Sequence, residues 1–152
     1  MFIEIDLGEH KHPIFYREFG EGPALIFLHG GWGYEMYPFD RQIREFHERF
    51  RVLIPDRIGY GKSSRKQVFP RGFHKLLALE TIAFMDKLSI EKAFLWGHSD
   101  GAVTSALMGI MSPDRIEGIV MEAAHYYRCK AGSKSFFETA ATNPEKFGEK
   151  VV

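Results

Sequence analysis

A serine between two glycines is the first feature of this 152-residue sequence that points to chemistry. The segment Gly97-His98-Ser99-Asp100-Gly101 follows the pattern G-x-S-x-G, in which a tight turn between a strand and a helix holds the serine hydroxyl exposed. An apolar run precedes this segment and a stretch of small residues follows it, as the pattern requires. The turn also directs the backbone N–H of Asp100 toward the place where an oxyanion would form. We therefore predict a nucleophile at Ser99 and an oxyanion donor at Asp100.

A second glycine-rich segment, His29-Gly30-Gly31-Trp32-Gly33, directly follows the apolar run of residues 24–28. Such a loop leaves backbone N–H groups available, and one of them can donate a second hydrogen bond to an oxyanion. An ordinary turn between a strand and a helix has a similar composition. At this point the residues leave both interpretations open.

A third segment, residues 56–64 (DRIGYGKSS), follows another apolar run and is interpreted as architecture. Its glycines permit a sharp turn, and the side chains of Asp56, Ser63 and Ser64 can bond to nearby backbone groups. The spacing is not that of a phosphate-binding loop. It is also not the G-x-G-x-x-G of a dinucleotide site.

Strand and helix patterns alternate along the chain after residue 24, which predicts an α/β fold. Its mostly parallel sheet carries helices on both faces. The first two strands are close enough in sequence to form an antiparallel hairpin at one edge. Strands are predicted at residues 2–6, 14–19, 24–28, 51–56, 93–97 and 116–122, and helices at 38–50, 73–88 and 100–111.

Composition excludes several classes of function. Lys and Arg total 20 and Asp and Glu total 20, so the zero net charge argues against a nucleic-acid binder and against a polybasic membrane anchor. The single cysteine, Cys129, cannot form an intramolecular disulfide. The His, Asp and Glu residues lack the spacing of metal ligands, so we expect no metal. Without an apolar run of about 18 residues we expect a soluble, cytoplasmic protein.

The three glycine-containing segments, in this order and each after a buried strand, resemble the N-terminal half of an α/β-hydrolase-fold enzyme. The resemblance covers residues 1–124 as the core of the domain. Residues 125–152 resemble the start of the helical cap that this family inserts after the sixth strand. We therefore expect a chain that is truncated, with a fold incomplete at its C-terminus.

The resemblance implies roles for individual residues. Ser99 matches the nucleophile, and the backbone N–H groups of Asp100 and Gly31 match the two oxyanion donors, with Trp32 as the near alternative to Gly31. Trp32 and His98 match positions that line the substrate pocket. His29 matches a structural histidine beneath the oxyanion loop. No cofactor is implied.

The catalytic acid and base of the family usually follow the seventh and eighth strands, and this chain contains neither strand. Glu122 lies where some relatives place the acid, but we favour a buried or capping carboxylate. His125 lies at the same edge of the sheet, and we favour a cap or pocket histidine. The patterns around four other histidines place them in loops or on helix surfaces, and these are His10, His12, His47 and His74.

The expected reaction is acyl transfer to water by a serine hydrolase. The expected substrate is small and largely apolar: an ester, a lactone, a carbon–carbon bond next to a ketone, or a peptide N-terminus. Serine rather than aspartate at position 99 argues against the dehalogenase and epoxide-hydrolase reactions that share this fold. The alternative is a non-catalytic half-domain that binds a partner, or forms a homo-oligomer, through its open sheet edge.

Overall fold

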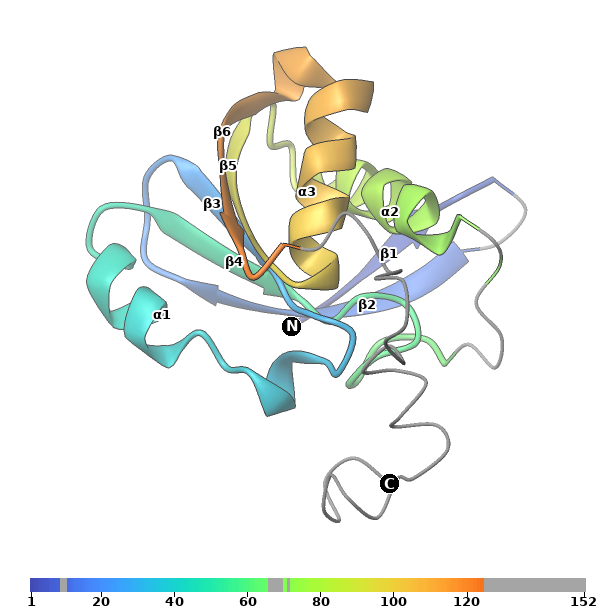
Figure 1. Cartoon of the computed structure of the whole chain (residues 1–152), viewed down its shortest axis with the longest axis horizontal. Coiled ribbons are helices and arrows are strands. Elements are labelled where there is room, and N and C mark those ends of the chain that lie inside the picture. The colour runs from blue at the N-terminus through green and yellow to red at the C-terminus, as the bar shows by residue number, and fades with distance from the viewer. Residues whose placement is uncertain (9–10, 66–69, 71, 125–152) are drawn as a thin grey trace, which may run out of the picture.

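The computed structural model describes residues 1–8, 11–65, 70 and 72–124. These residues form one six-stranded sheet with the strand order β1-β2-β4-β3-β5-β6 (Figure 1). The prediction of an α/β fold with a mostly parallel sheet is confirmed. The strands are β1 (Phe2–Asp6), β2 (Lys11–Phe19), β3 (Ala24–Leu28), β4 (Arg51–Pro55), β5 (Ala93–His98) and β6 (Ile116–Glu122).

The N-terminal hairpin forms one edge of the sheet, as predicted. β1 pairs antiparallel with β2, with Phe2 opposite Phe15, and β2 pairs antiparallel with β4. The pairs β3–β4, β3–β5 and β5–β6 are all parallel. The carboxyl ends of β3, β4 and β5 therefore lie at one edge, and each of the three glycine-containing segments begins there.

Helices cover both faces of this sheet (Figure 1). The α-helices are α1 (Asp40–Phe46), α2 (Phe73–Lys87) and α3 (Asp100–Met111), and the short 3-10 helices are η1 (Tyr34–Met36) and η2 (Pro113–Arg115). In Figure 1, α1 lies on one face, whereas α2 and α3 lie together on the other.

The helix predicted over residues 38–50 is too long, because α1 ends at Phe46. The ring Nδ1 of His47 lies 2.9 Å from the carbonyl oxygen of Ile43 and 3.1 Å from that of Arg44. The His47 ring thus adds a contact to the carbonyl groups of the last turn, where its backbone N–H already donates to the Ile43 carbonyl at 3.0 Å. The apolar spacing continues to Phe50 because that ring also packs on the core, not because the helix continues.

The core has two halves, one on each face of the sheet. Side chains alternate along β3, so that Ile26 and Leu28 join the cluster with α2 and α3, whereas Leu25 and Phe27 join the cluster with α1. Strands buried on both faces in this way show continuous apolar runs in sequence. The buried β3 and its neighbour β5, which is buried at every second residue, position the turns at their carboxyl ends.

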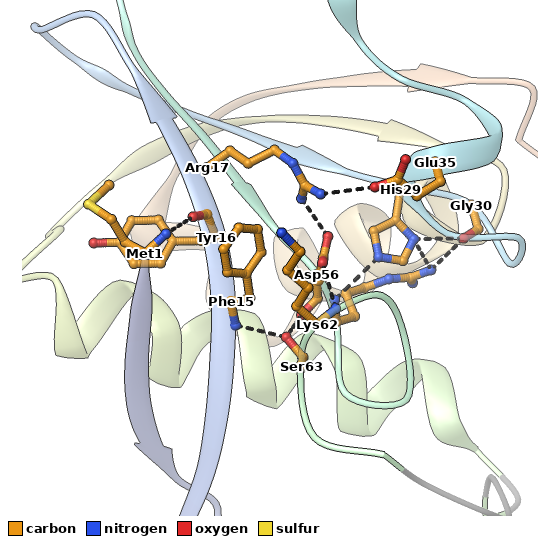
Figure 2. Close-up of polar contacts among 11 residues, drawn as sticks. Met1, Phe15, Tyr16, Arg17, His29, Gly30, Glu35, Asp56, Lys62 and Ser63 are labelled. Carbon is orange, nitrogen blue, oxygen red and sulfur yellow. Dashed lines mark hydrogen bonds and ion pairs between the residues drawn. The ribbon is translucent and has the colours of Figure 1, made fainter.

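The turn after β4 is held by side chains, as its composition predicted. The Asp56 carboxylate accepts hydrogen bonds from the Arg17 guanidinium at 2.6 Å and from the backbone N–H of Lys62 at 3.0 Å. The hydroxyl of Ser63 donates to the backbone carbonyl of Asp56 and accepts from the backbone N–H of Phe15 at 2.9 Å (Figure 2). These bonds fix the path of the chain that runs beneath the loop after β3.

Close packing of α3 on the sheet gives the first prediction. A Cβ at Gly101 would overlap the carbonyl oxygen of Leu28, whereas a Cβ at Gly109 would meet the flexible end of Ile119 at 2.9 Å. We expect Gly101→Ala to lower the free energy of unfolding by about 1–3 kcal/mol, the usual cost of overpacking. The matched Gly109→Ala gains helix propensity and should change it by less than about 1 kcal/mol. Urea unfolding measures both, and equal effects would contradict this packing.

Candidate active site

Ser99 stands at the turn between β5 and α3 in a backbone conformation that L-residues rarely adopt. Its φ is 53° and its ψ is −116°. Such a conformation costs roughly 1–3 kcal/mol and persists only where its surroundings enforce it. Here the Ser99 N–H donates to the carbonyl of Glu122 at 2.9 Å, and the Ser99 carbonyl accepts from the N–H of Ala102 at 3.0 Å.

The glycines on either side of Ser99 allow the turn to close. A Cβ at Gly97 would overlap the backbone of Gly101, and a Cβ at Gly101 would overlap the carbonyl of Leu28. The turn thus packs on itself and on the end of β3 without any side chain between the backbones. The G-x-S-x-G pattern therefore requires glycine at positions 97 and 101 because neither position has room for a Cβ.

The loop after β3 lies directly against this turn. A Cβ at Gly30 would come within 3.1 Å of both the Ser99 Cβ and the His98 Nδ1, and a Cβ at Gly31 would come within 2.5 Å of the Asp100 carboxylate. The structure therefore brings together the three predicted residues Ser99, Gly31 and Asp100. Asp100 also begins α3, where backbone N–H groups lack partners within the helix and carry partial positive charge.

His29 lies buried beneath this loop. Its Nδ1 is 2.8 Å from the Gly30 carbonyl oxygen, and its Nε2 accepts the backbone N–H of Arg57 at 3.2 Å (Figure 2). A ring that donates from Nδ1 and accepts at Nε2 is neutral. Burial, reinforced by the positive charge of Arg57, lowers the pKa of His29 well below 6.5.

His98 and Trp32, the two predicted pocket residues, flank the candidate site. The His98 ring stacks on Tyr37 at 3.9 Å with an interplanar angle of 6°, and its Nδ1 is buried without a hydrogen-bond partner in the described part of the chain. Burial lowers the pKa of His98, opposed by the charge of Glu122. The Trp32 side chain is 42% exposed.

The Glu122 carboxylate is held by two donors. Tyr37 Oη donates to one oxygen at 2.7 Å, and the Trp96 indole N–H donates to the other at 3.1 Å. These bonds tie the segment before α1 to the ends of β5 and β6. They favour the architectural role of Glu122 over that of a catalytic acid.

Two residues beside the site are not recognisable from the sequence. The pattern around His74 predicts a loop or helix surface, but its Nε2 lies 3.0 Å from the Asp100 carboxylate, and its side chain is only 20% exposed. The composition around Arg57 predicts a turn, but its guanidinium is fully buried and bonds to the Gly30 carbonyl at 3.0 Å. No local pattern marks either contact, because the partners are 26 and 27 residues apart in sequence.

Comparison with known proteins agrees with this geometry. A family model described as the alpha/beta hydrolase fold matches residues 23–151. The chain belongs to this family. The α/β-hydrolase turn that holds Ser99 and the adjoining glycine-rich loop both fall within the matched residues.

Relatives with different names match to similar degrees. Over 124 residues the chain is 31% identical to the Mus musculus protein named Bifunctional epoxide hydrolase 2, a match that covers 78% of this chain and 21% of that protein. Over 132 residues it is 30% identical to the Mus musculus protein named Serine hydrolase BPHL, covering 85% of this chain and 44% of that protein. The chain spans less than half the length of these two relatives.

A solved structure of a variant of a meta-cleavage product hydrolase matches with a TM-score of 0.70 and 25% identity, covering 78% of this chain and 44% of that one. The predicted cap, residues 125–152 with His125, lies outside the described residues, as does His10. No helix in the described part of the chain combines the length and apolar character that crossing a membrane would require.

The buried His29 gives a pH prediction. Below a pH of about 6.5 the unfolded chain binds a proton at this histidine that the folded chain does not, so the free energy of unfolding falls as the pH falls. One such site contributes at most about 1.4 kcal/mol per pH unit. His29→Gln keeps a donor and an acceptor but does not titrate, so its stability should fall less steeply between pH 7 and 5.

Urea unfolding at a series of pH values measures this slope. His98 adds to it in the same direction, so the variant retains part of the pH dependence. His47→Gln, a histidine at the end of α1 outside this network, is the control. The same slope in His29→Gln as in the unmodified chain would show that His29 titrates alike in the folded and unfolded states.

Proposed function

We propose that this chain carries the nucleophile and the oxyanion donors of a serine hydrolase that transfers acyl groups to water. The observation that supports this most directly is the strained backbone of Ser99, at φ 53° and ψ −116°, packed against the Gly30–Gly31 backbone. A strained serine at the end of a buried strand has its hydroxyl exposed and its neighbouring N–H groups directed outward. Ser89 and Ala123 also have positive φ, so the strain at Ser99 supports this role only together with the glycine packing around it.

In the proposed reaction the Ser99 Oγ adds to the carbonyl carbon of the substrate while a base takes its proton. The resulting oxyanion accepts hydrogen bonds from the N–H groups of Gly31 and Asp100. Collapse of this intermediate expels the leaving group, which takes up the proton, and water then hydrolyses the acyl-serine. No cofactor takes part.

The general base and its acid are assigned to residues outside the described part of the chain. Among the described contacts, no histidine ring is bonded to the Ser99 hydroxyl. Two nearby candidates are engaged elsewhere, since His29 bonds to Gly30 and Glu122 accepts from Tyr37 and Trp96. The ring of a third, His98, stacks on Tyr37. Without a base, a serine hydroxyl is a poor nucleophile at neutral pH.

The substrate class is a small, largely apolar carbonyl compound. Aromatic side chains beside the turn support this, namely the exposed Trp32 and the stacked pair of Tyr37 and His98. Two relatives at nearly equal identity are named an epoxide hydrolase and a serine hydrolase, so identity does not choose between these reactions. The serine at position 99 supports the second. A cytoplasmic location stays a prediction from composition.

Replacement of the nucleophile tests the proposal. In the full-length protein we expect Ser99→Ala to reduce hydrolysis of p-nitrophenyl esters by at least about 10³-fold, as loss of a catalytic nucleophile does. Ser112→Ala, at the other end of the same helix, should retain activity. Circular dichroism and thermal unfolding check that both variants fold. Turnover that survives in a folded Ser99→Ala would exclude Ser99 as the nucleophile.

A second candidate function, assembly through the sheet edge, has its own support. β6 is the last strand at one edge of the described sheet, and Ile119 and Val120 on it are 36% and 45% exposed. An apolar hollow beside them is lined by aromatic residues of the α1 face. Contiguous apolar surface next to the open edge of a sheet, here the outer edge of β6 in the described chain, marks an interaction site. The lining aromatic residues are Phe46, Phe50, Phe94 and Trp96.

If the chain associates with itself through this edge, a charged side chain placed on β6 should weaken the dimer. The 152-residue chain should form dimers whose population rises with concentration in sedimentation velocity, and Val120→Lys should shift it to monomers. Ile110→Lys places the same charge on α3, where Ile110 is 77% exposed, and should leave the dimer intact. A chain that is monomeric at all concentrations, or a dimer that both substitutions weaken equally, would exclude this edge.

A further inference from the structure

Arg57 is a cation in an unusual place. It follows β4 directly, and its side chain is fully buried beneath the loop after β3. Only its Nη2 is bonded, to the Gly30 carbonyl at 3.0 Å, with the His29 Nδ1 a further 3.3 Å contact. The Nε and Nη1 atoms are buried without hydrogen-bond partners in the described part of the chain. A buried charge with incomplete bonding is costly, so its position calls for an explanation.

The acids around Arg57 are engaged with other donors. Asp56 accepts from Arg17 and from the Lys62 N–H, Glu80 accepts the Ile58 N–H, and Asp100 lies against His74. Burial lowers the pKa of Arg57, whereas Tyr60, Glu80 and Asp100 raise it. A guanidinium nevertheless stays protonated in proteins. The positive charge beneath the loop is therefore permanent.

The Gly30 carbonyl oxygen, to which Arg57 donates, lies within hydrogen-bond distance of three donors. Besides the guanidinium, the Gly30 oxygen lies 2.8 Å from the His29 Nδ1 and accepts the Gly33 N–H at 3.1 Å. A carbonyl oxygen has two lone pairs, so this one is saturated. Three donors fix the direction of the C=O bond firmly toward the interior.

The Gly30 carbonyl and the Gly31 N–H belong to one peptide unit. That unit is planar and trans, because the described residues contain no cis peptide bond. In a trans peptide the N–H points opposite to the C=O, so an inward carbonyl turns the Gly31 N–H away from Arg57 and His29. Hydrogen bonds to a carbonyl also polarise its peptide, which strengthens the N–H as a donor.

We propose that Arg57 is a positioning residue that orients and polarises the Gly30–Gly31 peptide, so that the Gly31 N–H is ready for an oxyanion before substrate arrives. The inference rests on the proposed function, because it concerns one of the two proposed oxyanion donors. It assigns to the buried cation an electrostatic role that a neutral hydrogen-bond donor would fill only in part. Charge-assisted hydrogen bonds are roughly twice as strong as neutral ones.

Three substitutions separate charge from packing. Arg57→Gln removes the charge and keeps a donor, Arg57→Met removes both, and Arg57→Lys keeps the charge. Arg51→Gln is the matched control, since Arg51 lies on β4, pairs with Glu18 at 2.7 Å and has no bond to the loop. If Arg57→Met fails to fold, the Gln and Lys variants carry the comparison.

The first readout is the ¹⁵N resonance of the Gly31 amide, which hydrogen bonding to the preceding carbonyl shifts downfield. We expect it to move upfield in Arg57→Gln and further in Arg57→Met, to stay closer to its original position in Arg57→Lys, and to be unaffected by Arg51→Gln. The second readout is ester hydrolysis by the full-length protein. There kcat should fall about tenfold or more in Arg57→Gln with KM changed less than about twofold, because the lost interaction acts in the transition state.

The outcomes separate this inference from the proposed function. An unchanged Gly31 resonance in a folded Arg57→Gln or Arg57→Met overturns the inference whatever the activity, and so does an unchanged kcat in an enzyme that depends on Ser99. A shifted Gly31 resonance without Ser99-dependent hydrolysis supports the link between Arg57 and the peptide and overturns the proposed function. A shifted resonance with a kcat that Arg57→Lys partly restores supports both.

Discussion

Direct contact between backbones at the ends of β3 and β5 is the constraint on which the rest of the site depends. Gly97, Gly101 and Gly30 stand where a Cβ would meet another backbone segment or Ser99 itself. Without side chains between them, the loop after β3 and the turn after β5 reach a separation that ordinary residues do not allow. The strain at Ser99 can persist because β3, which is buried along its whole length, and β5, which is buried at every second residue, hold both segments from behind.

A polar layer beneath this contact connects the third glycine-containing segment to the other two. The Arg57 backbone N–H bonds to His29, the Arg57 guanidinium bonds to Gly30, and Asp56 just before it is fixed by Arg17 from β2. Buried polar groups are expensive unless bonded, so such a layer rigidifies the structure where it is satisfied. The turn after β4 thus acts on the candidate site through the loop it supports, although none of its side chains is proposed to touch substrate.

The sequence predicted the fold well because the central strands β3 and β4 are buried on both faces. Continuous apolar runs marked β3, β4 and β5, and alternation marked β1, so the strand bounds differ by only a few residues. The helix predicted at residues 38–50 is too long because the apolar spacing continues to Phe50, whereas α1 ends at Phe46 and residues 47–49 form a turn. The apolar pattern therefore predicts which side chains are buried better than it predicts where a helix ends.

Only the turns and loops of the candidate site were predictable from the sequence; the side-chain contacts that support them were not. Glycine and serine spacing predicted Ser99 and Asp100, and the family resemblance added Gly31, because their proposed roles depend on turns, which are local. The contacts of Arg57 and His74 join segments that the fold brings together, and charged residues in a turn or on a helix are usually solvated, so nothing in their neighbourhood distinguished them. Sequence patterns therefore suggest which backbone groups are the proposed donors, whereas tertiary structure was needed to show what orients them.

The separation between backbone donors and the side chains that react also helps to explain how relatives with different names share one fold. Backbone donors and a buried cation can stabilise negative charge whichever side chain delivers it, and oxyanion stabilisation and binding alone account for rate enhancements of about 10³–10⁴ in hydrolases that have lost their nucleophile or base. The geometry around Gly31 is thus compatible with more than one reaction. The choice among reactions falls to the residue at position 99 and to the base that reaches it. A serine there is of use only with a proton acceptor, and in the proposed reaction that acceptor is a residue outside the described part of the chain.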